Sequence, residues 1–215
     1  MHAVIDSFLL IYAGLFAIVN PVASAPLFLV LTQESTRDER HVLARKVGVN
    51  GFLLLLGSLF VGSHVLEFFG ITLPAVRVAG GLVVMAFSWK LLNDDMLEHR
   101  TGGHTGSSAP VDAFYPLTMP LTVGPGSISV AITLGSQRPK APAGVEQLGL
   151  LAGGAVLGLV AMGVTIYLCY RFAERIVPAL GVSGTNVLMR LSAFILLCIG
   201  VQIAWNGVNA FIAAQ

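Results

Sequence analysis

The sequence predicts an all-α membrane protein whose six transmembrane helices form two inverted three-helix repeats. Of its 215 residues, 55% are hydrophobic and only 11% are charged, against about 25% charged in an average soluble protein. The apolar residues fall in six long runs, and two of these runs contain the same pair of prolines. With 12 basic and 11 acidic residues, the chain lacks the basic excess that a nucleic-acid partner requires.

Each of the six runs reaches the length of about 20 residues that a helix needs to cross a bilayer. They cover residues 7–32, 47–69, 71–92, 114–136, 148–172 and 187–214. A membrane barrel would alternate apolar and polar residues, so continuous runs indicate helices. The chain is thus expected to consist of a first repeat at 1–92, a flexible polar linker at 93–113 and a second repeat at 114–215.

Basic residues indicate the orientation of these helices. The first, third and fifth loops and the helix ends beside them contain Arg37, Arg40, Arg45, Lys46, Lys90, Arg100, Arg171, Arg175 and Arg190. The other side has Arg77, Arg138 and Lys140. Because positive residues collect on the cytoplasmic side, both termini are expected on the periplasmic or extracellular side.

The first and fourth runs share a Pro-x4-Pro pattern. One reads Asn20-Pro-Val-Ala-Ser-Ala-Pro26 and the other Met119-Pro-Leu-Thr-Val-Gly-Pro125. Each of the third and sixth runs has one arginine shortly after its start, Arg77 and Arg190. Since each half has three crossings, the second half enters the membrane from the opposite face, which predicts an inverted repeat typical of transporters.

Two prolines in one membrane helix are expected to break it, because each removes a backbone donor and clashes with the carbonyl four residues earlier. The carbonyls of Ala17 and Val22, and those of Pro116 and Leu121, would lose their donors. Pro26 and Pro125 are predicted to begin new half-helices, whose free N–H groups suit an anion. Alternatively, the prolines only kink the helices, and neighbouring groups satisfy the freed carbonyls.

A binding site is predicted where the two breaks meet, because small side chains and exposed backbone lie there together. Neither break contains a charged residue, so the expected ligand is small and neutral overall, such as an amino-acid zwitterion. The candidate substrate-binding residues are Asn20, Pro21, Ala23, Ser24, Ala25, Pro26, Pro120, Thr122, Gly124, Pro125, Gly126 and Ser127.

Other polar residues inside the predicted helices have two interpretations each. Gln202 and Asn206 share one helical face, which either lines a substrate path or hydrogen-bonds to a neighbouring helix. His64 and Glu67 are close enough to carry a coupled proton, although Glu67 is also expected to pair with Arg77.

The sequence gives no indication of an enzyme, a cofactor or a metal site. The patterns of zinc proteases, serine hydrolases and phosphate-binding loops are absent from it. His99 and His104 lie in the linker without the cysteines or second histidine pair of a metal site.

Three segments resemble the MarC family of bacterial inner-membrane proteins: residues 17–28, residues 114–127 and residues 199–207. The resemblance covers essentially the whole chain. It implies six membrane spans in the inner membrane and transport of small neutral amino acids such as glycine and alanine, with proton coupling proposed. By resemblance, the positions of the family's signatures are Asn20, Pro21, Pro26, Pro120, Gly124, Pro125 and Gly126.

Two other classes of function fit the same sequence. In a channel-like pore the breaks would form a permanently open constriction, and an exporter for another small neutral solute is a further alternative. A membrane scaffold without transport activity would bind no solute. Saturable flux with competition by alanine would argue against the pore, and loss of all solute binding would favour the scaffold.

Overall fold

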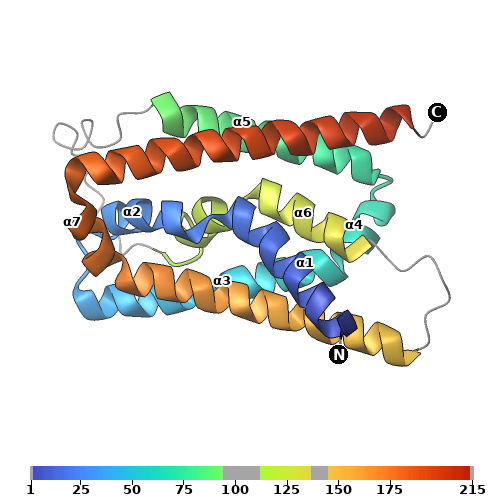
Figure 1. Ribbon diagram of the computed structural model, residues 1–215, viewed down its shortest axis with the longest axis horizontal. Helices are drawn as coiled ribbons and strands as arrows, with labels where there is room; N and C mark the ends of the chain where they lie inside the picture. Colours follow the sequence, from blue (N-terminus) through green and yellow to red (C-terminus); the bar gives the residue numbers. More distant parts are fainter. Residues whose placement is uncertain (1, 94–111, 137–144, 214–215) are drawn as a thin grey trace.

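The protein is nearly all helical in the computed structural model, which describes residues 2–93, 112–136 and 145–213 (Figure 1). In chain order the elements are α1 (His2–Val19), α2 (Pro21–Leu31), α3 (Arg37–Phe60), α4 (Gly62–Phe68), α5 (Leu73–Asn93), η1 (Leu117–Thr122), α6 (Pro125–Ser136) and α7 (Val145–Ile212). Most of the predicted linker, with His99 and His104, lies outside the described residues.

Among the described residues, five segments are long and apolar enough to cross a membrane. They are Ala3–Leu29, Arg37–Phe60, Leu73–Lys90, Glu146–Arg175 and Ala193–Ile212. The predicted crossing at 114–136 differs, because it contains the six-residue η1 and the 12-residue α6 instead of one long helix. At 1.5 Å per residue α6 is only about 18 Å long, against a hydrocarbon core of about 30 Å.

Helix α7 consists of two parts that fold back on each other. Gly181, with φ 66° and ψ 176°, interrupts the helical conformation. Such a positive φ is accessible to glycine without steric cost. The residues before Gly181 form the first part of α7 and those after it the second part. Figure 1 shows that these parts run in opposite directions, so α7 supplies both of the last two apolar segments.

The long helices and the two broken segments lie in antiparallel pairs (Figure 1). Helix α3 lies beside the first part of α7, and α5 lies beside the second part. The chain from α1 to α2 and the chain from η1 to α6 form the third pair, which lies between the other two. The two segments with paired prolines therefore lie between the two outer pairs of helices, although side chains such as Leu9 and Val22 stay exposed.

Glycines allow the outer pairs to pack with their backbones in contact. A Cβ on Gly48 of α3 would lie 2.9 Å from the carbonyl oxygen of Gly163 in α7. A Cβ on Gly81 of α5 would lie 2.7 Å from the carbonyl oxygen of Gly200. Small residues permit this close approach of membrane helices, and both crossings hold the long helices as walls around the middle pair.

Ion pairs fix one end of the molecule, where α2 turns into α3. Thr36 and Glu39 form a capping box at the start of α3. Arg40 donates to the carbonyl oxygen of Thr32 at 3.0 Å and pairs with Glu174 of α7, which Arg37 also contacts at 3.1 Å. These contacts tie the end of α2 to both helices of one outer pair. At the opposite end, the start of α1 and the end of α7 lie on the same side (Figure 1).

Candidate functional site

The first break lies at a single residue, Asn20. Helix α1 ends at Val19, and Asn20 adopts the left-handed conformation with φ 42° and ψ 61°. Asparagine tolerates this conformation better than most residues. Pro21 then begins α2, at a position where its missing N–H costs nothing. The carbonyl of Asn20 accepts from the backbone N–H groups of Ala23 at 3.1 Å and Ser24 at 3.2 Å, which closes the first turn of α2.

The prediction that Pro26 begins the second half-helix is wrong. Pro26 lies inside α2, where it is buried. The break forms at Pro21 because the residue before it, Asn20, can turn into the left-handed region. The residue before Pro26 is Ala25, whose Cβ disfavours that conformation.

The second break extends over several residues. In η1, Met119 has the extended angles φ −118° and ψ 125°, and after η1 Val123 is also extended, with φ −117° and ψ 92°. The peptide bonds before Pro116 and Pro120 are cis. Helix α6 begins at Pro125, as the sequence predicts.

Backbone hydrogen bonds in the second break join residues five apart. Thr118 donates to Ala113 at 3.1 Å, and Val123 donates to Thr118 at 2.8 Å. The prediction of an unpaired carbonyl at Pro116 is wrong, because this carbonyl accepts from the N–H of Leu121 at 3.3 Å. Pro120 has no N–H to donate, but the wider turn gives the carbonyl of Pro116 a hydrogen-bond donor one residue later.

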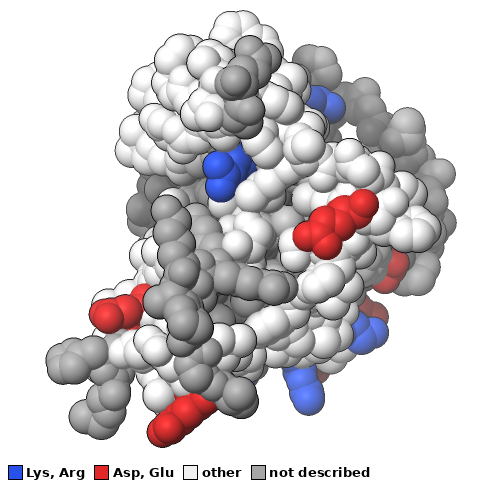
Figure 2. Space-filling model, turned by 90° about the vertical axis from the view of Figure 1, so that its right-hand side faces the viewer, with Lys and Arg blue, Asp and Glu red and all other residues white. Residues whose placement is uncertain are grey.

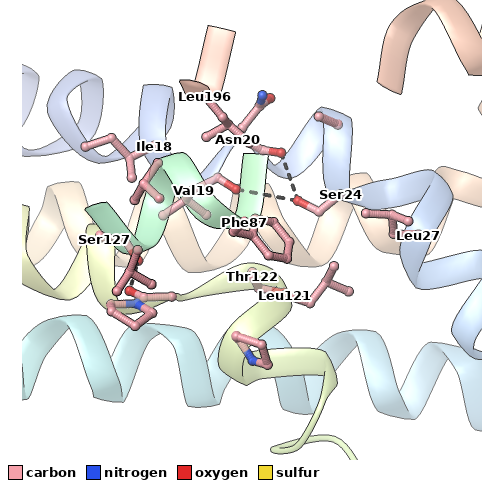
Figure 3. A pocket seen from close by; sticks show the side chains of 17 residues that line it. Ile18, Val19, Asn20, Ser24, Leu27, Phe87, Leu121, Thr122, Ser127 and Leu196 are labelled. Atoms are coloured by element: carbon pink, nitrogen blue, oxygen red, sulfur yellow. Dashed lines mark hydrogen bonds between the residues drawn. The ribbon is translucent and has the colours of Figure 1, made fainter. Parts of the chain in front are cut away.

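One pocket of about 90 Å³ lies between the two breaks (Figure 3). It is small beside the roughly 300–1,000 Å³ of sites for drug-sized ligands. Nine of the predicted binding residues line it: Asn20, Ala23, Ser24, Pro120, Thr122, Gly124, Pro125, Gly126 and Ser127. The other three, Pro21, Ala25 and Pro26, are buried and do not line it.

The two walls of the pocket present different backbone groups. On the side of α1 and α2, Figure 3 shows the hydroxyl of Ser24 directed at the carbonyl oxygens of Asn20, at 2.8 Å, and Val19, at 3.5 Å. On the opposite side, the N–H groups of Gly126 and Ser127 in the first turn of α6 have no acceptor among the described residues. The free N–H groups and the helix dipole make this wall favourable for an anion.

Apolar side chains from the broken segments, from α5 and from the second part of α7 complete the pocket, and sequence reasoning missed them. They are Ile18, Val19, Leu27, Val83, Val84, Phe87, Leu121 and Leu196. Figure 3 shows Phe87 of α5 close to the labelled residues of both breaks. None of the residues lining the pocket is ionisable. In a sequence where most positions are apolar, no spacing distinguishes these side chains from those facing lipid.

The polar residues proposed for a path or for coupling lie away from the pocket. His64 and Glu67 are exposed in the short helix α4. The expected ion pair between Glu67 and Arg77 is absent from this part of the structure, where Arg77 donates to the hydroxyl of Thr133 at 3.3 Å. Gln202 and Asn206 are exposed on α7, where Gln202 donates to Asn206 at 2.9 Å.

Tyr170 of α7 contacts both the second break and α2. Its hydroxyl lies 2.7 Å from that of Thr122, which lines the pocket. Its ring stacks on Phe28 of α2, with the ring centroids 4.4 Å apart. Tyr170 is 1% exposed, and one tyrosine among many apolar residues gave no signal in the sequence.

Long apolar helices around two broken segments define a polytopic membrane protein. Residues 5–212 match the family described as MarC family integral membrane protein, and the chain belongs to this family. The predicted family is therefore confirmed.

Curated relatives align over nearly their whole length. The UPF0056 membrane protein MJ1677 of Methanocaldococcus jannaschii is 30% identical over 204 residues, covering 94% of this chain and 96% of the relative. YvbG of Bacillus subtilis is 30% identical over 204 residues, covering 93% and 92%. YhcE of Escherichia coli is 28% identical over 202 residues, covering 92% and 90%. No solved structure matches the chain.

Proposed function

We propose that the protein is a secondary transporter of small neutral amino acids, such as glycine and alanine, in the bacterial inner membrane. The observation that supports the proposal is the pocket between the two breaks, because the backbone of two helix ends borders it and its lining contains no ionisable side chain. A zwitterion has no net charge but needs a partner for each of its ends. Backbone carbonyls and amides supply such partners without a charged residue.

The two walls suggest how the zwitterion lies. Its carboxylate would face the free N–H groups of Gly126 and Ser127 at the start of α6. Its ammonium would face the end of α1, where the carbonyls and the negative end of the helix dipole lie beside Ser24. The apolar side chains of Phe87 and Leu196 then leave room for only a small side chain on the substrate.

Six crossings arranged as an inverted repeat are part of the proposal. The fourth crossing would consist of η1 and α6 together. In this symmetry α1 would exchange with η1, α2 with α6, α3 with the first part of α7, and α5 with its second part. For example, α1 packs on α6 just as η1 packs on α2. The antiparallel course of each exchanged pair in Figure 1 also supports this symmetry.

Alternating access would follow from rocking one repeat against the other around the pocket. The pocket already extends to exposed side chains at Val83, Pro120 and Pro125. Both termini would lie outside the cytoplasm, because the end of the molecule with α2 and α3 carries the basic residues Arg37, Arg40, Arg45 and Lys46.

Flux into proteoliposomes tests the proposal. Purified protein is reconstituted, and uptake of labelled glycine and alanine is measured with a panel of amino acids as competitors. We expect saturable uptake that small neutral amino acids inhibit and that lysine and glutamate do not. Unsaturable flux would indicate a pore, and absence of both flux and binding would contradict transport.

Proton coupling through His64 and Glu67 is the remaining part of the proposal. Both residues are exposed in α4 and lie outside the pocket, so a proton would be exchanged at one end of the molecule. Uptake is compared with and without a pH gradient in the wild type and in Glu67→Gln. Loss of the gradient dependence in the variant is expected, and an unchanged dependence would exclude Glu67 as the carrier.

A further inference from the structure

A second cavity lies on the outer side of the molecule, between α3 and the first part of α7. Its volume is about 490 Å³, and it is lined by Arg45, Val49 and Phe52 from α3 and by Val160, Val164 and Tyr167 from α7. Gly48 and Gly163 also line it, at the crossing where the backbones of the two helices meet. Val49 is 50% exposed and Val164 is 49% exposed, so the groove faces the surroundings of the protein.

The groove has a polar end and an apolar end. Because α3 and α7 run antiparallel, Arg45 lies toward the end marked by Tyr167, and Phe52 lies toward the end marked by Val160. Arg45 and Phe52 are about 10 Å apart along the axis of α3, at 1.5 Å per residue. The apolar part therefore has the length of several methylene groups, with a guanidinium at one end.

A second arginine strengthens the polar end. Arg171 donates to the hydroxyl of Tyr167, and its guanidinium carbon lies 5.6 Å from the centre of the tyrosine ring. In the described part of the chain both salt bridges engage Glu174, with Arg37 and Arg40 as partners. Arg45 and Arg171 thus have no carboxylate within salt-bridge distance among these residues.

We infer that this groove binds an anionic phospholipid, with one acyl chain between α3 and α7 and the phosphate at Arg45 and Arg171. A chain of an integral membrane protein family has lipid beside such a surface, and the groove is apolar where the acyl chain would lie. Basic residues between helices at the membrane surface favour anionic headgroups. A second copy of the chain packed groove to groove would instead bring four arginines together without counter-charges.

Native mass spectrometry of the purified full chain tests the inference. The protein in detergent is titrated with phosphatidylglycerol or phosphatidylcholine that have identical acyl chains. We expect the wild type to prefer phosphatidylglycerol by about 25-fold, since each basic residue near an anionic lipid contributes about fivefold. Arg45→Gln and Arg171→Gln should each reduce the preference about fivefold, and the double variant should bind both lipids alike.

Matched variants separate this site from general effects on lipid binding. Val164→Trp should fill the groove and reduce the binding of both lipids, whereas Leu82→Trp on the exposed surface of α5 should not. Arg175→Gln removes an exposed charge that lies over Phe172 and outside the groove, so it should leave the preference unchanged. Equal binding of both lipids by the wild type, or an unchanged preference in the double variant, would overturn the inference. So would a dimer mass that Val164→Trp abolishes, because the groove would then be an interface between copies.

Discussion

The two breaks contain the same proline spacing but differ in extent. In the first, one left-handed residue, Asn20, separates two regular helices, and α2 continues through Pro26. In the second, the chain leaves helical geometry at Met119, stays in wide turns through Thr122 and resumes an α-helix at Pro125. Identical spacing has thus produced a sharp turn in one segment and a longer unwound stretch in the other.

The residues beside the prolines explain this difference. Asn20 precedes Pro21 and can adopt the left-handed conformation in one step. Met119 precedes Pro120 and takes the extended conformation that residues before proline favour. Gly124 and Gly126 flank Pro125, whereas Ala25 and Leu27 flank Pro26. The spacing of prolines therefore indicates that a helix is interrupted, and their neighbours decide where and over what length.

The largest loss of stability is expected from Gly126→Ala, at the second break. A Cβ on Gly126 would lie 1.9 Å from Cγ2 of Val84 in α5, so either the side chain of Val84 or the packing of α6 on α5 must shift. We expect a loss of about 3 kcal/mol in the free energy of unfolding, at the upper end of overpacking costs. Unfolding with sodium dodecyl sulfate in mixed micelles measures it.

A second substitution identifies the cause. Val84→Ala removes the clashing Cγ2 methyl group, so the double variant should recover most of the lost stability. Gly124→Ala is the matched control, because its Cβ would lie 3.3 Å from the carbonyl oxygen of Pro120 and meet no closer atom. Equal losses from Gly124→Ala and Gly126→Ala would contradict the packing explanation.

The next largest effect is expected from two alanines of α2, of which one lines the pocket and the other lies in the core. Ala23 lines the pocket, whereas Ala25 belongs to the hydrophobic core. Ala23→Val should weaken the binding of glycine about thirtyfold, equivalent to about 2 kcal/mol of overpacking in a small site. Ala25→Val should destabilise the fold while leaving affinity per folded molecule unchanged.

Equilibrium binding of labelled glycine to purified protein checks this pair. Size-exclusion chromatography of each variant measures the concentration of folded protein, to which the affinity is referred. If Ala25→Val lost affinity and Ala23→Val kept it, the pocket would lie on the wrong face of α2.

A smaller loss of stability is expected from substitution of Asn20, the residue with left-handed backbone angles. Asn20→Ala should cost about 1.5 kcal/mol of stability, because alanine pays the full steric cost of positive φ. Asn20→Gly should be nearly neutral, since glycine adopts this conformation freely. Met119→Ala is the counterpart in the second break, where the extended conformation suits alanine, and it should not reproduce the loss. Thermal unfolding of the three variants in detergent compares them.

Sequence patterns predicted the helical class, the family and six crossings, of which five are long apolar helices. They also predicted nine residues that line the pocket, because apolar runs and proline pairs have direct structural consequences. They failed at Pro26 and Pro116. There the outcome depends on which residue can leave helical geometry and on a five-residue turn that no spacing encodes. They also missed Phe87, Leu196 and Tyr170, which reach the breaks only through the packing of helices distant in sequence.

The smallest effect is expected from Tyr170→Phe, which tests whether the two breaks act together. The variant keeps the stacking on Phe28 but loses the hydrogen bond to Thr122, a loss of about 1 kcal/mol within a membrane protein. Tyr12→Phe is its matched control, because the hydroxyl of Tyr12 lies 3.0 Å from that of Thr165, between α1 and α7 and away from the pocket. Both variants should lose similar stability, but only Tyr170→Phe should change glycine affinity, since Thr122 lines the pocket. Equal changes in affinity would mean that Tyr170 supports the fold without positioning the two breaks.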